Sequence, residues 1–322
     1  MTHEELLETA ILRTILYADV FDFPMTIQEI HHFLIHDQPV GLEQVRHVLA
    51  NSGRLNRLLY RVNGYVCLAD RETLIALREA REQAAQQLWP KAVRYGWWLA
   101  RLPFVRMVAL TGALSVRNVP NGDDDLDYML VTAPHRVWLA RAFAILLVRV
   151  ARLRGVEICP NYVVAESALE QERRDVFTAH EVAQTVPLYG RGLYQRLLEA
   201  NMWVVSILPN ARMAFYDESQ RPLGRAWRLL KQVGEAVLGG WMGDQLERWE
   251  RQRKMRRFAA AMQMPYSAAR LDEQQIKGHF QDHGHPTLVR YHERLRRYGL
   301  EGGPGLVLQV TGYHEFLGKS EV

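Results

Sequence analysis

A glycine turn after one apolar run, with closely spaced aspartates opening the next, restricts the fold of this chain more than any other feature. Residues 105–111 read as a buried strand that leads into a tight turn at Gly112. Asp125 and Asp127 then open a second apolar run. Because side chains alternate between the two faces of a strand, both carboxylates point the same way while Leu126 points into the core. The pattern therefore predicts two acids side by side at one end of a sheet.

The two carboxylates predict a site for a divalent cation. Like charges on one strand face repel each other, and a metal ion between them offsets that repulsion. Magnesium suits such a site because it accepts carboxylate oxygens together with phosphate oxygens and water. Gly112 also lets backbone N–H groups at a helix start approach a phosphate closely. The alternative is that the acids at 123–125 belong to a solvated loop.

The same residues resemble the DNA polymerase β-like nucleotidyltransferase superfamily, which has a strand, a glycine turn and an Asp-x-Asp pair on the next strand. More narrowly, the chain is similar to bacterial proteins in which a winged helix precedes a nucleotidyltransferase domain. This resemblance covers most of residues 5–290 and rests on the segments 17–26, 111–114, 118, 123–127, 138–141, 159–162, 177–181, 187–190 and 201–203. The Asp-x-Asp core is its specific part.

The resemblance implies transfer of a nucleoside monophosphate from a nucleoside triphosphate to an acceptor hydroxyl, with release of pyrophosphate. Asp125 and Asp127 would be the catalytic residues and the ligands of Mg²⁺ or Mn²⁺, which offsets charge on the α-phosphate. Arg141 is either a phosphate contact or a surface residue. The histidine-containing segment 277–285 is interpreted as a polar loop that approaches the triphosphate rather than as a zinc site. The expected nucleotide contacts are Gly112, Ala113, Ser115, Asn118, Arg141, Asn161, Lys277 and His279.

Two residues depart from the superfamily pattern. Ala113 stands where a serine usually helps to hold phosphate, with Ser115 as the substitute. Asn161, on a strand expected at 156–164, stands where a third carboxylate is usual, and an amide cannot act as a base. Glu157 would point to the same face of that strand as Asn161 and is the candidate to replace the third carboxylate. These departures leave two alternatives open, a nucleic-acid-binding regulator and a nucleotide sensor, each with a catalytically degenerate transferase fold.

The first seventy residues predict a winged helix. Apolar residues recur at helical spacing over 4–17, Thr26 and Glu29 form a capping box, and a third helix is expected at 42–51. Two β-rich runs around Asn63-Gly64 then indicate a hairpin. A winged helix can contact nucleic acid, although the fold also serves as a packing or protein-interaction module. The candidate nucleic-acid contacts are Arg46, His47, Arg54, Arg57 and Arg61.

The domain organisation follows from these patterns and from a length of 322 residues. We expect an α+β protein with a winged helix at 1–70, a helical connector at 71–100, a nucleotidyltransferase domain with a mixed sheet at 101–210 and a mainly helical region at 211–322. Within the connector, Pro90 indicates a break, and the charged residues at 72–82, Arg78 among them, indicate a solvated face. His180 and Glu181 read as an ordinary helix surface.

Composition narrows the class of protein. Hydrophobic residues make up 48% and charged residues 24%, as in ordinary globular proteins, and the net charge is only +4. The arginine-rich stretch at 251–257 is a second candidate for nucleic-acid contact. Cys67 and Cys159 lie far apart in apolar runs, so we expect buried thiols in a reducing compartment. No signal peptide is evident, and arginines interrupt the longest apolar run, so we expect a cytoplasmic protein without a membrane partner.

Overall fold

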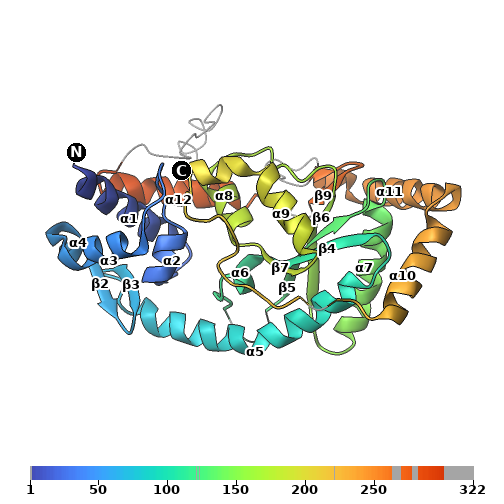
Figure 1. The fold of residues 1–322 in the computed structure, drawn as a ribbon, viewed down its shortest axis with the longest axis horizontal. Helices are drawn as coiled ribbons and strands as arrows, with labels where there is room; N and C mark the ends of the chain where they lie inside the picture. The colour runs from blue at the N-terminus through green and yellow to red at the C-terminus, as the bar shows by residue number, and fades with distance from the viewer. Residues whose placement is uncertain are drawn as a thin grey trace, which may run out of the picture.

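The computed structural model describes residues 2–120, 122, 124–220, 222–262, 270–277 and 282–300. Within these residues the chain combines α-helices with a mixed β-sheet, which confirms the α+β class (Figure 1). None of the described helices is long and apolar enough to cross a membrane. His279 and the segment after 302, where a short β-rich run was expected, lie outside the described residues.

The N-terminal unit consists of four helices and a three-stranded antiparallel sheet with the order β1-β3-β2. Thr26 and Glu29 form the expected capping box at the start of the second helix. Asn63 and Gly64 have φ angles of 53° and 82°, so the β2–β3 hairpin turns where the sequence predicted. The elements are α1 (His3–Asp19), β1 (Met25–Thr26), α2 (Ile27–His32), α3 (Leu42–Asn51), α4 (Gly53–Leu58), β2 (Leu59–Val62) and β3 (Tyr65–Leu68).

A single long helix, α5 (Leu74–Ala100), connects this unit to the central sheet. The expected break at Pro90 is wrong, because the helix continues through it and buried residues such as Leu88 and Ala92 hold it on both sides. The expectation of a solvated face is wrong at Arg78, whose side chain is completely buried. Its guanidinium contacts the carboxylates of Glu29 at 2.9 Å and Glu82 at 3.1 Å, which compensates its charge.

The central sheet has six strands in the order β7-β4-β5-β6-β9-β8, and β5 and β6 are its parallel pair. Two features differ from the sequence expectations. Pro187 lies inside a strand rather than between helices, which the sheet tolerates because β7 is at its edge. The region expected to be mainly helical also supplies two strands. The strands are β4 (Val105–Leu110), β5 (Leu126–Thr132), β6 (Ile158–Ala165), β7 (Val186–Tyr189), β8 (Arg270–Leu271) and β9 (Gln275–Lys277).

Helices cover both faces of this sheet (Figure 1). On one face α5 and α7 (Val137–Arg152) pack against Val108, Tyr128 and Leu130. On the other face α9 (Arg191–Ala200) packs against the alternate residues, such as Met107 and Met129. The short helix α6 (Gly112–Ser115) follows β4, and η1 (Met202–Ser206) follows α9. This arrangement leaves the start of β5 beside the turn that contains Gly112.

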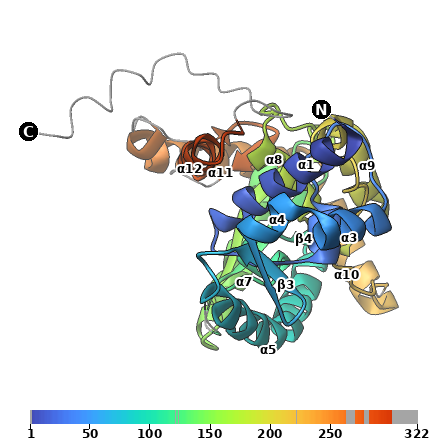
Figure 2. The ribbon, with the colours of Figure 1, turned by 90° about the vertical axis from the view of Figure 1, so that its left-hand side faces the viewer.

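Two later helices, α8 (Val176–Ala183) and α12 (Gly284–Arg297), share a core with the N-terminal unit (Figure 2). The ring of His180 stacks on Tyr17 with 4.0 Å between ring centroids, and Tyr291 meets Tyr17 edge-on. The expectation of an ordinary helix surface is therefore wrong at His180, which is buried. The remaining helices, α10 (Arg225–Leu238) and α11 (Trp241–Met262), lie at the opposite end of the molecule (Figure 1).

Candidate functional site

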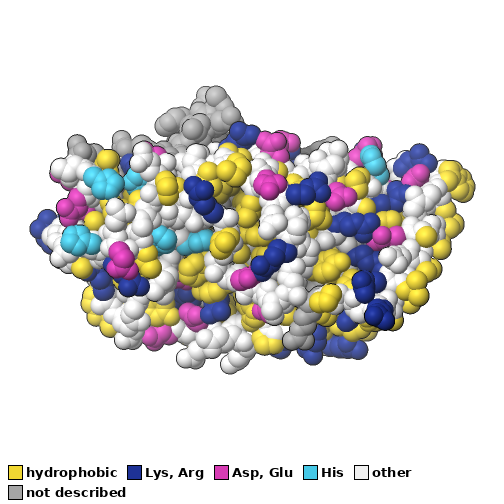
Figure 3. All heavy atoms as spheres, in the orientation of Figure 1, with side chains coloured by type: hydrophobic (Ala, Val, Ile, Leu, Met, Phe, Trp, Pro, Cys, Tyr) yellow, Lys and Arg dark blue, Asp and Glu magenta, His cyan; other side chains and the backbone are white. Residues whose placement is uncertain are grey.

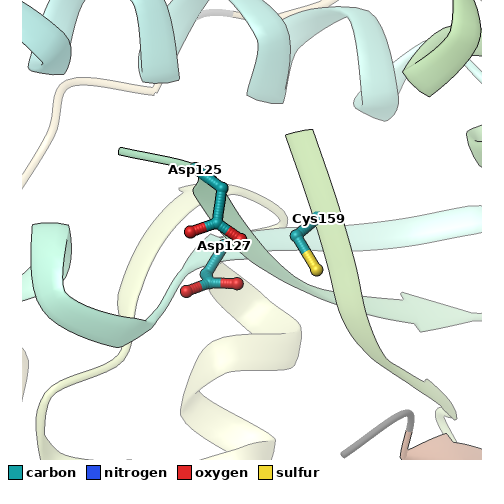
Figure 4. A group of neighbouring side chains, drawn as sticks. All are labelled: Asp125, Asp127 and Cys159. Carbon is teal, nitrogen blue, oxygen red and sulfur yellow. The ribbon is translucent and has the colours of Figure 1, made fainter. Parts of the chain in front are cut away.

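The two aspartates lie side by side where β5 begins, as the strand alternation predicts. One carboxylate oxygen of Asp125, one of Asp127 and the sulfur of Cys159 all lie within 4.8 Å of one another (Figure 4). We call these three residues the acidic cluster. Among the described residues it is the group of histidine, cysteine and acidic side chains whose spacing allows them to hold one metal ion.

Gly112 makes room for the Asp127 carboxylate. Its φ angle of 67° lies in the left-handed region, which glycine adopts without strain. A Cβ atom placed there would lie 2.4 Å from Oδ2 of Asp127. The backbone N–H of Thr111 donates to the carbonyl of Asp127, which holds the turn against β5. The glycine is therefore required both by the backbone conformation and by the carboxylate packed over it.

A bulge in β6 brings a second side chain to Asp127. Asp127 pairs with Cys159 and Met129 pairs with Tyr162, so β6 has one extra residue between these pairs. The amide of Asn161 donates to Oδ1 of Asp127 at 2.9 Å. Asn161 thus faces the aspartates, as expected from the sequence, and it fixes the orientation of the Asp127 carboxylate.

The acidic cluster is electrostatically strained. Burial, together with the charges of Asp125 and Asp124, raises the pKa of Asp127 to about 7. Burial also raises the pKa of Cys159 to about 12, with Asp127 adding to the shift, so the thiol stays protonated at neutral pH. No cation among the described side chains hydrogen-bonds or ion-pairs with Asp127. The cluster lacks the compensation that a bound cation would supply.

The donor set fits a hard divalent cation. Two carboxylates on one strand face offer oxygen ligands, which Mg²⁺ and Mn²⁺ prefer. The protonated thiol of Cys159 is a poor ligand for such ions and instead forms a hydrogen bond with Asp127. Asp125 and Asp127 are therefore the residues that could hold the metal, with substrate oxygens and water completing its coordination.

Other predicted residues make different contacts. The hydroxyl of Ser115 donates to the carbonyl of Gly112 at 2.8 Å, so it closes the turn. Glu157 forms an exposed ion pair with Arg152 and stays outside the acidic cluster. The amide of Asn118 accepts a hydrogen bond from Arg81 and donates one to the carbonyl of Phe21. Asn118 therefore ties the loop before the aspartates to α5 and the N-terminal unit.

Two buried polar atoms near the acidic cluster have no hydrogen-bond partner in the described part of the chain. They are Nε of Arg141, on α7, and the hydroxyl of Thr111, next to Gly112. Burial lowers the pKa of Arg141, whose charge in turn lowers that of Cys159. Buried donors of this kind near an acidic cluster call for an acceptor, because an unpaired buried donor costs free energy.

A large cavity of about 1270 Å³ opens beside Asp127. A pocket for one small ligand typically has a volume of about 300–1,000 Å³, so this cavity is larger than such a pocket. It extends to Tyr17 of α1 and Glu181 of α8. Gly112, Ala113, Asn118, Asn161 and Lys277 line it, as expected for nucleotide contacts, whereas Ser115 and Arg141 do not.

Glu181 is the acidic residue that the sequence reasoning assigned to an ordinary surface. Its side chain is open to the cavity and otherwise surrounded by protein, and this burial raises its pKa. The positive charges of Lys277 and His283 lower it, and Asp175 raises it. The charge of Glu181 also raises the pKa of Asp127, so the two carboxylates are within electrostatic reach of each other.

The arginines proposed as nucleic-acid contacts do not line this cavity. Arg46, Arg57 and Arg61 are exposed on α3, α4 and β2, and Arg54 is half-buried on α4. Arg46 pairs with Glu43, and Arg61 donates to Asn56. They remain candidates for a separate surface of the N-terminal unit.

Sequence reasoning missed Cys159 and Glu181. Cys159 shares strand parity with Glu157 and Asn161, so the same alternation that selected those residues could have selected it. Both cysteines are free; Cys67 is buried, as expected, and Cys159 is partly buried in the acidic cluster. Glu181 had no comparable signal, because only the packing of α8 against the N-terminal unit places it in the cavity.

Comparisons with known proteins give no match to this chain, whether with protein-family models, with curated proteins or with solved structures. The functional argument therefore rests on the geometry of the acidic cluster and the cavity.

Proposed function

We propose that the protein is a metal-dependent nucleotidyltransferase that moves a nucleoside monophosphate from a nucleoside triphosphate to an acceptor hydroxyl. The observation that carries this proposal is the pair of carboxylates at 125 and 127 beside the glycine turn at 112. The order of strand, glycine turn and Asp-x-Asp strand in the sheet supports assignment to the polymerase β-like fold. Helices and a hairpin in the order of a winged helix support that assignment for residues 1–70.

Asp125 and Asp127 would hold Mg²⁺ or Mn²⁺ together with the triphosphate oxygens. When bound, such an ion offsets negative charge at the α-phosphate and pyrophosphate. Asn161 keeps Asp127 in position through its amide hydrogen bond. The unpartnered hydroxyl of Thr111, which lines the cavity, would donate to a phosphate oxygen, and the charge of Arg141 would act on the phosphates only from behind the acidic cluster.

The acceptor would occupy the part of the cavity between Asp127 and the N-terminal unit. Tyr17 of α1 and Phe21, which follows that helix, line this part, so the N-terminal unit would form a wall of the acceptor site. Glu181 would take the proton of the acceptor hydroxyl, the role left open by Asn161, and its raised pKa suits a general base. The acceptor oxygen then bonds to the α-phosphorus while the bond to the pyrophosphate oxygen breaks.

The test is pyrophosphate release from labelled triphosphates with Mg²⁺ or Mn²⁺, in the presence of hydroxyl acceptors that include RNA and the protein itself. We expect turnover in the unaltered protein and none in Asp125→Ala or Asp127→Ala. Asp70→Ala removes an exposed carboxylate elsewhere and should leave turnover unchanged.

Two other outcomes would replace the proposal. Tight nucleotide binding without turnover would indicate a nucleotide sensor, which Asn161 in place of a third carboxylate favours. Salt-sensitive nucleic-acid binding that survives both aspartate substitutions, with no turnover, would indicate a regulator that uses the N-terminal arginines or the basic stretch of α11.

A further inference from the structure

Helix α10 turns its polar side toward the rest of the protein. The ammonium of Lys231 is buried and donates to the carbonyls of Ala100 and Val105. The carboxylate of Glu235 accepts hydrogen bonds from the guanidinium of Arg106 at 2.7 and 3.0 Å and one from the backbone N–H of Phe104. These contacts fix which side of the helix faces inward.

Helix α11 is oriented in the same way. Its buried residues are Gly243 and the charged Glu247, Glu250 and Lys254. The carboxylate of Glu247 accepts from the backbone N–H groups of Trp138 and Leu139 at 2.8 and 2.7 Å, at the start of α7. In a monomeric surface helix the apolar stripe normally faces the core and the charged side faces water. Most of α10 and the first half of α11 reverse this arrangement, whereas Leu238, Met255 and Phe258 pack against the core.

Their outward side is apolar and exposed. Trp241 is 73% exposed, Leu230 66% and Trp249 59%, and Figure 3 shows hydrophobic side chains gathered along this edge of the molecule. We call this surface the α10–α11 face. Its large apolar side chains are Trp227, Leu229, Leu230, Val233, Val237, Trp241, Met242, Leu246 and Trp249.

The size of this face matches what a stable interface needs. An aromatic residue offers on the order of 150–250 Å² and the aliphatic residues somewhat less, so the exposed fractions amount to about 1,000 Å². The largest apolar patch on a typical monomer is only about 300–600 Å². A standard protein–protein interface buries about 800 Å² on each partner.

The spacing of the apolar residues is that of helices that pack against other helices. Along α10, Ala226, Leu230, Val233 and Val237 follow at intervals of four, three and four residues. Along α11, Met242, Leu246 and Trp249 follow at intervals of four and three. Such a stripe forms the contact line between paired helices. An apolar stripe is also complementary to itself, as a two-fold symmetric dimer requires.

We propose that the α10–α11 face is the dimer interface of this protein and is covered by the same face of a second copy of the chain. The acidic groups of both helices are already committed, Glu235 to Arg106, Asp244 to Arg136 and Glu250 to Arg253. The face therefore offers its partner apolar contact rather than a pattern of ion pairs. This inference does not depend on the proposed enzymatic activity.

The experiment is sedimentation of the full chain over a concentration series, with and without charges in the stripe. We expect a dimer for the unaltered protein, and a monomer for the double variant Leu230→Glu, Val237→Glu. Placing two carboxylates per copy in an apolar contact should weaken association about 100-fold or more. Because both side chains are exposed, the circular dichroism spectrum and thermal transition of the variant should remain those of a folded protein.

Leu153→Glu is the matched control, since Leu153 is 88% exposed at the end of α7 and is not one of the residues of the α10–α11 face. It should sediment as a dimer. A monomeric unaltered protein at tens of micromolar would overturn the inference, as would a double variant that still dimerises. Flotation of a monomeric chain with anionic phosphatidylserine vesicles, lost in the double variant, would assign the face to a membrane surface instead.

Discussion

Arg78 and Asp127 are both charged side chains held inside the protein, one at the joint between the N-terminal unit and α5, the other at the start of β5. The guanidinium of Arg78 has two carboxylates and two backbone carbonyls as partners. Asp127 has two acidic neighbours, one amide and a thiol. In the first region the fold supplies every opposite charge. In the second it concentrates like charges, and no cation in the described part of the chain pairs with Asp127.

The difference separates charges that hold the structure together from charges that, on the proposed function, bind a metal ion. Removing a fully paired buried ion by substitution strongly lowers the stability of the fold, because the charges of its partners are left uncompensated in the interior. A group of like charges with an open cavity beside it raises the energy of the protein until a cation arrives. Substitutions in the two regions should therefore change different quantities.

Replacement of Arg78 by Met should have the largest effect on stability. It leaves Glu29 buried without its cation, so we expect the free energy of unfolding to fall by about 3–5 kcal/mol. Urea denaturation followed by circular dichroism measures this change. Arg46→Met, at an exposed position, should stay within about 0.5 kcal/mol of the unaltered protein. A loss below 1 kcal/mol for Arg78→Met would show that the joint is not held by this pair.

Asp127→Asn should behave in the opposite way. It removes a desolvated charge from a repulsive cluster, so the free energy of unfolding should stay the same or rise. If the protein is a nucleotidyltransferase, pyrophosphate release should fall about 100- to 1000-fold, the usual effect of removing one electrostatic group from an active site. Asp124→Asn, outside the acidic cluster, is the control and should retain most of the turnover. A lower free energy of unfolding for Asp127→Asn than for the unaltered protein would contradict the contrast drawn between Arg78 and Asp127.

The packing of α8 against the N-terminal unit should also weaken in mild acid, through His180. Burial lowers the pKa of His180 to about 4, so the unfolded chain, with a pKa near 6.5, binds the proton more readily. Stability contributed by the neutral ring is full above pH 6.5 and is lost as the pH falls toward 4. We expect a loss of about 2 kcal/mol between pH 7.5 and pH 5 from this residue. Denaturation at both values should show a smaller difference for His180→Gln, and an unchanged difference would refute the assignment.

Gly112→Ala should give a modest loss of stability and a selective change at the acidic cluster. The left-handed backbone should cost about 1–2 kcal/mol with any side chain. Gly155→Ala is the matched control, because its φ angle of 69° imposes the same strain and nothing lies within 4 Å of the added Cβ. Only Gly112→Ala displaces the Asp127 carboxylate, so only that variant should weaken Mn²⁺ binding, measured by titration calorimetry. Equal Mn²⁺ affinity in the two variants would contradict the proposed packing of the Asp127 carboxylate against Gly112.

The sequence by itself determined the local features of this protein. Period-two alternation places Asp125 and Asp127 on one face, and the capping box at Thr26 and the hairpin at Asn63-Gly64 follow from interactions between near neighbours. These features depend on bond geometry and on contacts a few residues apart, which any window of the sequence contains. The pair of aspartates in the acidic cluster could be predicted for this reason, whereas Cys159 was missed.

Only the tertiary structure decided what each side chain meets across the fold. The burial of Arg78 depends on Glu29, 49 residues away, and the place of Glu181 in the cavity depends on how α8 packs. The bulge in β6 and the continuation of α5 through Pro90 likewise depend on packing from outside the segment. Charge alone cannot tell a solvated arginine from a paired one, because the desolvation and the partner both come from distant parts of the chain.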